Sequence, residues 1–150
     1  LKDRKNILDI GCGANKTLAR AKGVDFVPKG KRIPTLDEDS ISQADIEADV
    51  SKDLPIDDNS QDAIVARHIL EHIIDPITAL GNWINKLKDG GKMIIAVPNH
   101  ERINSITMNL EHVHAFTPQS LGILLASMGL KDIKVHDPRN YVSFIMEATK

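Results

Sequence analysis

Short apolar runs rich in isoleucine and valine alternate with longer amphipathic stretches along the chain. Such runs predict buried strands, and apolar positions recurring every three to four residues predict helices. This alternation is typical of α/β proteins, in which helices cover a parallel sheet. We expect seven strands, which span Asn6–Ile10, Gly23–Val27, Ala44–Val50, Asp62–Ala66, Lys92–Val97, Leu130–His136 and Val142–Ala148.

Two helices have clear start and stop signals. Asp75-Pro76 predicts a helix start, because Asp caps free amides and Pro tolerates the first turn, and this helix should close at Gly90-Gly91. Thr117-Pro118 repeats the start signal, and Gly129 ends the second helix. Each helix has one apolar stripe: Ile77, Leu80, Ile84 and Leu87 in the first, and Leu121, Leu124, Leu125 and Met128 in the second.

Two long segments look irregular. Pro28–Ser42 is rich in charge, proline and glycine, and lacks a good helical pattern. Pro98–Phe116 is polar, with a short helix expected around Ile106–Leu110. The second segment follows the carboxyl end of a predicted strand, which is where ligands bind in open α/β sheets.

Composition limits the classes of function. A length of 150 residues with 41% hydrophobic residues suits one domain over residues 1–150. The net charge of −2 and an aromatic share of 3% argue against nucleic acid or a membrane surface as partner. A single cysteine, Cys12, excludes an internal disulfide, and no apolar stretch is long enough to span a bilayer. We therefore expect a cytoplasmic protein.

Two glycines follow the first predicted strand, in the segment LDIGCGANK of residues 8–16. They indicate either a tight turn or a close approach of backbone to a ligand. A P-loop is excluded because no Gly-Lys-Ser/Thr ending is present. A nicotinamide-dependent oxidoreductase fits poorly, because the third glycine of its fingerprint would fall at Lys16 and Asp25 comes too soon for its ribose-binding acid.

The order of several motifs resembles the class I S-adenosylmethionine-dependent methyltransferases. The matching blocks cover nearly the whole chain: LDIGCG, Val24-Asp25, Ala48–Val50, Leu54–Val65, Leu70–Pro76, Leu87–Ile95 and His112–Pro118. The resemblance is strongest to small bacterial and archaeal members. It implies a Rossmann-like sheet of seven strands in the order 3-2-1-4-5-7-6, with only the last strand antiparallel.

The resemblance also implies how the cofactor S-adenosylmethionine is held. Gly11 and Gly13 would line its methionine and ribose, while Asp9 orients the turn. Asp25 would accept the ribose hydroxyls, so that Asp25→Ala should weaken cofactor binding and leave the fold nearly as stable. Asp49 and Val50 would meet the adenine, and Arg67 and His68 the methionine end. The full predicted cofactor-binding set is Asp9, Gly11, Cys12, Gly13, Asp25, Phe26, Asp49, Val50, Arg67 and His68.

Three features depart from the family pattern. The stretch from Gly13 to Asp25 is short, so the first helix should be cut to about two turns. Asn15 stands where many members have a third glycine, although asparagine tolerates left-handed backbone. The helix that usually precedes the first strand is absent from this sequence. A more open cofactor pocket would follow.

Histidines gather in two groups, His68 with Glu71 and His72, and Glu111 with His112 and His114. Three interpretations stay open: packing and capping, a general base, or a metal site. The metal site is suggested by similarity to small-RNA 2′-O-methyltransferases and some quinone-pathway O-methyltransferases. We predict His68, His112 and His114 as catalytic candidates and assign no residue as a metal ligand.

We therefore expect an enzyme that transfers a methyl group from S-adenosylmethionine to an unidentified acceptor. An oxygen or nitrogen atom of a small molecule is favoured, because the chain lacks a basic face for nucleic acid. The acceptor surface should come from Arg67–Asp75, Pro98–Phe116 and, in part, a partner protein. The alternative is a non-catalytic subunit that binds S-adenosylmethionine as a regulator.

Overall fold

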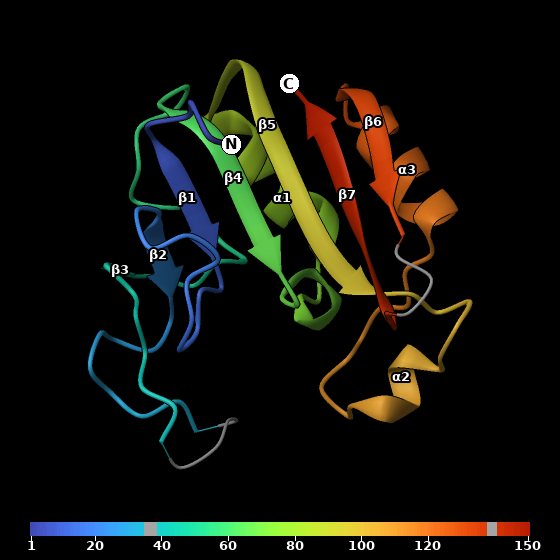
Figure 1. Ribbon diagram of the computed structural model, residues 1–150, viewed down its shortest axis with the longest axis horizontal. Helices are drawn as coiled ribbons and strands as arrows, with labels where there is room; N and C mark the ends of the chain where they lie inside the picture. The colour runs from blue at the N-terminus through green and yellow to red at the C-terminus, as the bar shows by residue number, and fades with distance from the viewer. Residues whose placement is uncertain (35–38, 138–140) are drawn as a thin grey trace.

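A seven-stranded sheet forms the centre of the molecule (Figure 1). The computed structural model describes residues 1–34, 39–137 and 141–150. The strand order is β3-β2-β1-β4-β5-β7-β6, and β7 runs antiparallel to both β5 and β6, which confirms the expected topology. The strands are β1 (Ile7–Ile10), β2 (Lys22–Asp25), β3 (Ile46–Glu47), β4 (Gln61–Arg67), β5 (Leu87–Pro98), β6 (Lys131–His136) and β7 (Ser143–Thr149).

Both long helices begin where the sequence signals predict. In α1 (Pro76–Lys86) the Asp75 carboxylate accepts the Thr78 N–H at 3.0 Å. In α3 (Pro118–Ser127) the Thr117 side chain forms a capping box with Ser120. The first helix ends earlier than expected, because the chain turns into β5 at Leu87 and the two glycines lie within that strand.

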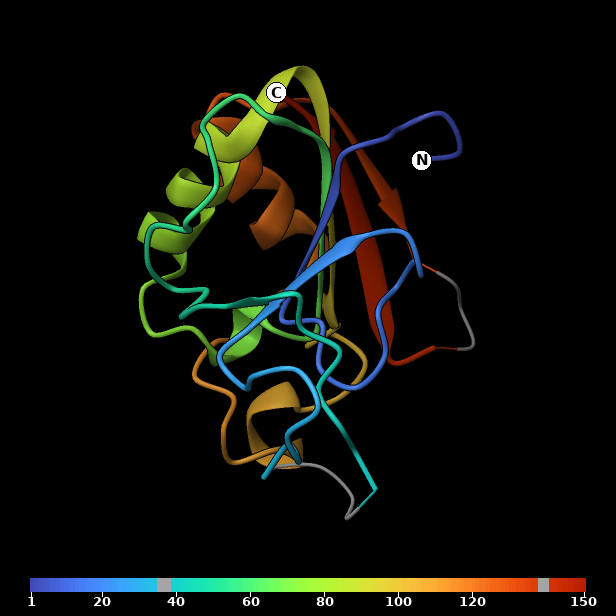
Figure 2. The same ribbon diagram turned by 90° about the vertical axis from the view of Figure 1, so that its left-hand side faces the viewer.

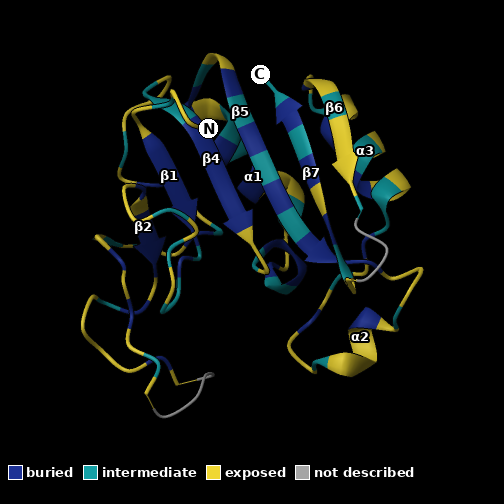
Figure 3. Cartoon of the chain, viewed as in Figure 1, coloured by how far each residue is buried: buried dark blue, intermediate teal, exposed yellow. Residues whose placement is uncertain are grey.

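The two faces of the sheet are covered unequally. Both α1 and α3 pack on one face (Figure 2), above a large apolar core that includes Ile64, Trp83, Ile95 and Phe144. The opposite face carries no helix in the described parts of the chain, and its core is small: Ile7, Ala21, Ala63 and Val65. Along β5 and β7, buried residues alternate with half-buried or exposed ones (Figure 3). An ion pair of 3.1 Å joins Lys92 to Glu147.

The expected two-turn helix after β1 does not form. Residues 11–21 are turns and bends, so this part of the prediction is wrong. The reason lies in one side-chain contact to β1 and one tight backbone turn. The Asp9 carboxylate accepts the Thr17 N–H, and Ala21 donates to the Leu18 carbonyl oxygen at 2.9 Å. A helix would have used these amides for its own ladder.

The irregular segments are partly as expected. Arg32 and Ile41 form an antiparallel bridge within the second crossing, of which residues 35–38 lie outside the described structure. The expected strand Ala44–Val50 shortens to β3, and the short helix α2 (Ser105–Met108) lies near its expected place. No helix in the described ranges has the length and apolar character that a membrane span needs.

Candidate active site

The carboxyl ends of β1, β2, β4 and β5 meet at one edge of the sheet, which we call the carboxyl edge (Figure 1). The strand order reverses between β1 and β4, and open α/β sheets bind ligands at this switch point. The turn after β1 and the segment after β4 both lie there. Arg67 joins them, because its guanidinium donates to the Asn15 carbonyl oxygen at 2.7 Å.

Contacts within the protein itself require glycine at position 11. Its φ of +64° lies in the left-handed region, where a residue with a side chain is strained. A Cβ atom added here would lie 2.7 Å from Cγ1 of Ile69, the residue before the short turn η1 (Leu70–His72). Gly13 also has a positive φ, of +55°, but its nearest neighbour, Ile33, would be 3.9 Å away. Bare space for a ligand therefore exists at Gly13 rather than at Gly11.

Asp25 is tied to the glycine turn. Its two carboxylate oxygens accept the Gly13 N–H at 2.9 Å and the Val27 N–H at 3.1 Å. A carboxylate has about four lone pairs, so both oxygens can still accept hydroxyls. The side chain is almost buried, and alanine here would leave two amides without their acceptor. Asp25 is therefore structural as well as a candidate ligand, contrary to the expectation that Asp25→Ala leaves the fold nearly as stable.

Asp9 lies beneath the same turn and is fully buried. Burial raises the pKa of its carboxyl group, while the hydrogen bond from Thr17 and the charges of Arg67 and Lys16 lower the pKa. Because its partner is the Thr17 amide, Asp9 holds the turn in place.

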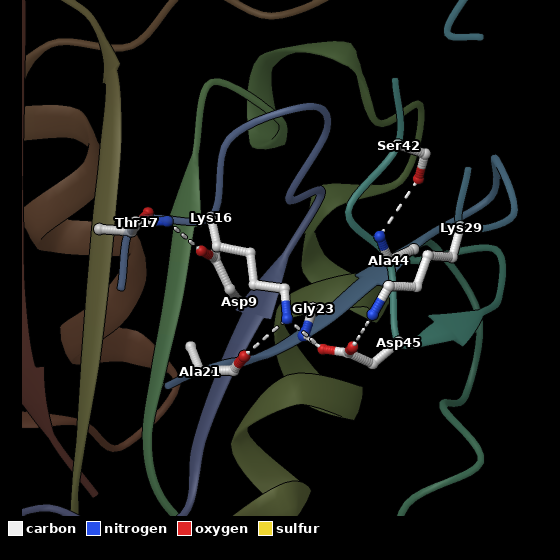
Figure 4. A network of polar contacts seen from close by, with 9 residues as sticks. All are labelled: Asp9, Lys16, Thr17, Ala21, Gly23, Lys29, Ser42, Ala44 and Asp45. Carbon is white, nitrogen blue, oxygen red and sulfur yellow. Dashed lines mark hydrogen bonds and ion pairs between the residues drawn. The ribbon is translucent and has the colours of Figure 1, made fainter. Parts of the chain in front are cut away.

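A second polar network ties the turn to β2 and β3 (Figure 4). The Lys16 ammonium pairs with Asp45 and donates to the Ala21 carbonyl oxygen at 3.2 Å. Asp45 also accepts from the Gly23 N–H at 2.9 Å and from Lys29 at 3.2 Å. The hydrogen bond from Lys16 contributes most to a pKa of Asp45 far below its ordinary value. No sequence pattern predicts this pair, and its only signal is Lys16 at the end of the glycine motif.

The remaining predicted cofactor residues differ in exposure. Cys12 is buried against Gly23, and desolvation raises the pKa of its thiol to about 12, so it packs as a neutral thiol. Phe26 and Asp49 are exposed, and hydrogen bonds from Ser51 lower the pKa of Asp49. The Val50 carbonyl oxygen accepts the indole N–H of Trp83 at 2.9 Å.

The three predicted catalytic histidines occupy different environments. His68 has a left-handed φ of +52°, its Nδ1 lies 3.2 Å from Glu71 Oε1, and its Nε2 lies 3.5 Å from the Ser143 hydroxyl. His112 is buried, with Nε2 3.9 Å from the same Glu71 oxygen. His114 Nε2 lies 3.2 Å from the Ile74 carbonyl oxygen. Of the three, only His68 combines an exposed ring with a carboxylate partner.

A cavity of about 440 Å³ lies elsewhere, at the amino ends of β1, β2 and β4. Its lining includes Lys5, Arg20, Lys22 and Asp57. None of the predicted site residues borders it. We place the candidate site at the carboxyl edge, because the glycine turn, Asp25 and His68 meet only there.

Comparisons with known proteins identify the family and the fold. Residues 1–135 match the family described as "Methyltransferase domain". The O-methyltransferase cnsE of Penicillium expansum is 28% identical, with 92% of this chain and 56% of that protein covered. A ubiquinone biosynthesis O-methyltransferase of Xanthomonas axonopodis pv. citri is also 28% identical, with 62% of this chain and 43% of that protein covered.

Solved structures show the same fold at lower identity. A SAM-dependent methyltransferase of Archaeoglobus fulgidus superposes with a TM-score of 0.77 at 18% identity, covering 99% of this chain and 87% of that one. The chain spans only 36% to 56% of the length of the curated relatives that it matches.

Proposed function

Since the chain belongs to the methyltransferase domain family, we propose that it transfers a methyl group from S-adenosylmethionine to an oxygen or nitrogen atom of a small molecule. Family membership confirms the resemblance found in the sequence. It supports the proposed enzyme class and the proposed cofactor. The acceptor, the site residues and the single domain over residues 1–150 belong to the proposal. A cytoplasmic location belongs to it too and rests on the lone, buried Cys12.

One observation carries the proposal: the hydrogen bond from Gly13 to Asp25 joins the turn after β1 to the end of β2, beside the switch point. This bond fixes a carboxylate next to bare backbone. The cofactor needs both. Its ribose hydroxyls need a hydrogen-bond acceptor, and its methionine part needs open space beside the backbone. In the proposed arrangement Asp25 binds the ribose, Asp49 with Val50 faces the adenine, and Arg67 closes over the methionine end.

Methyl transfer requires an acceptor held in line with the methyl group, and little covalent chemistry from the protein. We assign His68 as the proposed base. Its Nδ1–H donates to the Glu71 carboxylate, which leaves Nε2 as an acceptor for a proton. The side chains of Ile74 and Val113, in the two segments expected to form the acceptor surface, are exposed and apolar. They suit a small molecule with an apolar body better than a nucleic acid.

The first test is calorimetric titration with S-adenosylmethionine and, separately, NAD. Asp25→Asn should raise the cofactor Kd about 10- to 100-fold, the loss expected for hydrogen bonds to a charged group. The matched control is Asp57→Asn, an exposed acid that lines the cavity at the amino ends. That variant should bind like the unaltered protein, and the opposite pattern would place the cofactor in the cavity.

Turnover is measured separately, as formation of S-adenosylhomocysteine with a panel of phenols, catechols and amines. Methylation of at least one class is expected, and it should fall when His68 is replaced by asparagine. Saturable cofactor binding with no product from any acceptor would favour the alternative, a regulatory subunit that binds S-adenosylmethionine. Absence of binding would refute the proposed function.

A further inference from the structure

The cavity at the amino ends of β1, β2 and β4 lies at the opposite end of the sheet from the carboxyl edge (Figure 1). Its volume of about 440 Å³ falls within the range of about 300–1,000 Å³ that is usual for small-molecule sites. Parallel pairing of β1 with β2 and β4 brings the starts of the three strands together. Residues far apart in the sequence therefore line one cavity.

Positive charge gathers in this cavity. Three cationic side chains line it, Lys5, Arg20 and Lys22, against a single acid, Asp57. The lining therefore has a surplus of two positive charges, although the whole chain has a net charge of −2. A cleft lined by one sign of charge focuses the electric field and concentrates ions of the opposite sign. We therefore expect the cavity to attract anions.

The acid nearest to Lys5 does not neutralise its ammonium group. Asp62 accepts the Lys5 backbone N–H at 3.0 Å, but its carboxylate pairs with Lys88 at 2.6 Å. Among the residues that the structure describes, the ammonium groups of Lys5 and Lys22 form no ion pair and no hydrogen bond. An anion could therefore bind both groups without displacing a protein partner.

Arg20 adds a guanidinium group that a backbone contact holds in place. It donates to the Leu1 carbonyl oxygen at 2.7 Å. A guanidinium group has several other N–H donors, so most of them remain for a ligand. Guanidinium and ammonium groups both bind phosphate, and a phosphate monoester carries about 1.5 to 2 negative charges at pH 7. That charge matches the surplus of the lining.

Much of the remaining lining is neutral and polar. Asn6 Nδ2 donates to the Ser60 carbonyl oxygen at 3.3 Å, and Gln61 Nε2 donates to Ser60 Oγ at 2.8 Å. These contacts leave the side-chain oxygens of Asn6 and Gln61 as acceptors, together with the Asp57 carboxylate. Such acceptors bind hydroxyl groups. A bare phosphate ion would leave most of the cavity to water, so the lining suits a larger, hydroxyl-bearing ligand.

We propose that this cavity binds a small phosphate monoester with a hydroxyl-bearing body, such as a sugar phosphate. The phosphate lies among Lys5, Arg20 and Lys22, and Asp57 accepts hydrogen bonds from the hydroxyl groups. Nucleic acid fits less well, because Asp57 and Asp62 border the three cations and repel an extended polyanion. The site is separate from the carboxyl edge and does not rest on the proposed function.

Binding is measured by calorimetric titration of the whole chain with ribose 5-phosphate, inorganic phosphate and ribose. One ribose 5-phosphate per chain should bind, more tightly than either fragment. The double variant Lys5→Gln, Lys22→Gln should weaken this binding at least about 10-fold, because two charge-assisted hydrogen bonds are lost. The matched control, Lys131→Gln with Lys134→Gln, removes the same charge from β6 and should bind like the unaltered protein.

Asp57→Asn tests the contact with the body of the ligand. The substitution removes a negative charge near the phosphate and weakens the acceptor of the hydroxyl groups. The affinity for ribose 5-phosphate relative to that for inorganic phosphate should therefore fall. An unchanged ratio, or equal affinities of the unaltered protein for the two ligands, would overturn the hydroxyl-bearing body.

Three results would overturn the site itself: no binding of ribose 5-phosphate, equal weakening in the β6 control, or competition between ribose 5-phosphate and S-adenosylmethionine. Urea unfolding followed by the fluorescence of the buried Trp83 shows that the double variant keeps its fold. This variant should bind S-adenosylmethionine with an unaltered Kd, because neither lysine lies at the carboxyl edge. Failure of ribose 5-phosphate binding with retained cofactor binding therefore leaves the proposed function standing, and the reverse result would refute only that function.

Discussion

Replacing Gly11 with alanine should destabilise the protein even when no cofactor is present. The new side chain would force a left-handed residue at φ +64°, at a cost of about 1–2 kcal/mol. Its Cβ would also lie 2.7 Å from Cγ1 and 2.9 Å from Cβ of Ile69, and such overpacking costs about 1–3 kcal/mol. Together these effects predict a loss of about 2–5 kcal/mol.

Urea unfolding followed by fluorescence measures this loss, because Trp83 is the single tryptophan and is buried. Gly129→Ala is the matched control. Gly129 has φ +87°, but a Cβ there would meet nothing within 4 Å. The control should therefore show the backbone cost alone, about 1–2 kcal/mol.

A double-mutant cycle separates the steric contribution. Ile69→Ala removes the Cγ1 and Cδ1 atoms that the new Cβ would meet but keeps the Cβ of residue 69 at 2.9 Å. The coupling between the two substitutions should therefore be measurable but smaller than the full overpacking cost of about 1–3 kcal/mol. If Gly11→Ala is as stable as the control, or if the cycle shows no coupling, the contact with Ile69 does not explain the glycine. A variant of full stability that fails only to bind S-adenosylmethionine would show that the cofactor alone requires bare backbone at Gly11.

Three other predictions concern separate contacts. Trp83→Phe should cost about 1–3 kcal/mol by circular dichroism, because the buried Val50 carbonyl loses its donor; an unchanged midpoint would contradict this. Asp62 has its pKa lowered from 3.8 to about 2 by an amide hydrogen bond and by Lys88. The ionised Asp62 stabilises the fold above pH 3.8, and this stabilisation is lost as the pH falls through about 2. The free energy of unfolding, measured by urea titration at each pH, should therefore fall less steeply between pH 3.8 and 2 in Asp62→Asn than in the unaltered protein. His68→Asn should lower kcat about 10²- to 10⁴-fold and be more stable than His68→Ala, because asparagine tolerates the left-handed backbone; equal kcat in His68→Asn and the unaltered protein would exclude the base.

The central strands could be predicted because each contains an apolar run that is buried in the sheet. Ile7–Ile10 and Gln61–Arg67 lie at the centre, where no polar pattern competes with that signal. The end of α1 was misplaced for a physical reason. Leu87 fits the apolar stripe of the helix and is also the first residue of β5. No sequence signal distinguishes a helical from an extended conformation at this residue.

The sequence predicts which residues lie near one another at the carboxyl edge, but not the contacts that they make. Parallel strands bring Asp25 and Arg67 to one edge, so their neighbourhood follows from topology. The missing first helix could not be foreseen, because it depends on the bond between Asp9 and the Thr17 amide. The pairing of Lys16 with Asp45 is equally hidden, since the two residues are far apart in sequence and carry no shared pattern.

The histidine cluster shows why a catalytic assignment needs the structure. Sequence spacing places Glu71 beside His72, but His112 lies beside them because Val113 and His114 donate to the Glu71 carbonyl oxygen. Those bonds also position Val113, which lines the proposed acceptor surface. The same peptide contacts therefore position both His112 and Val113, so a change in the backbone of this loop should disturb both together.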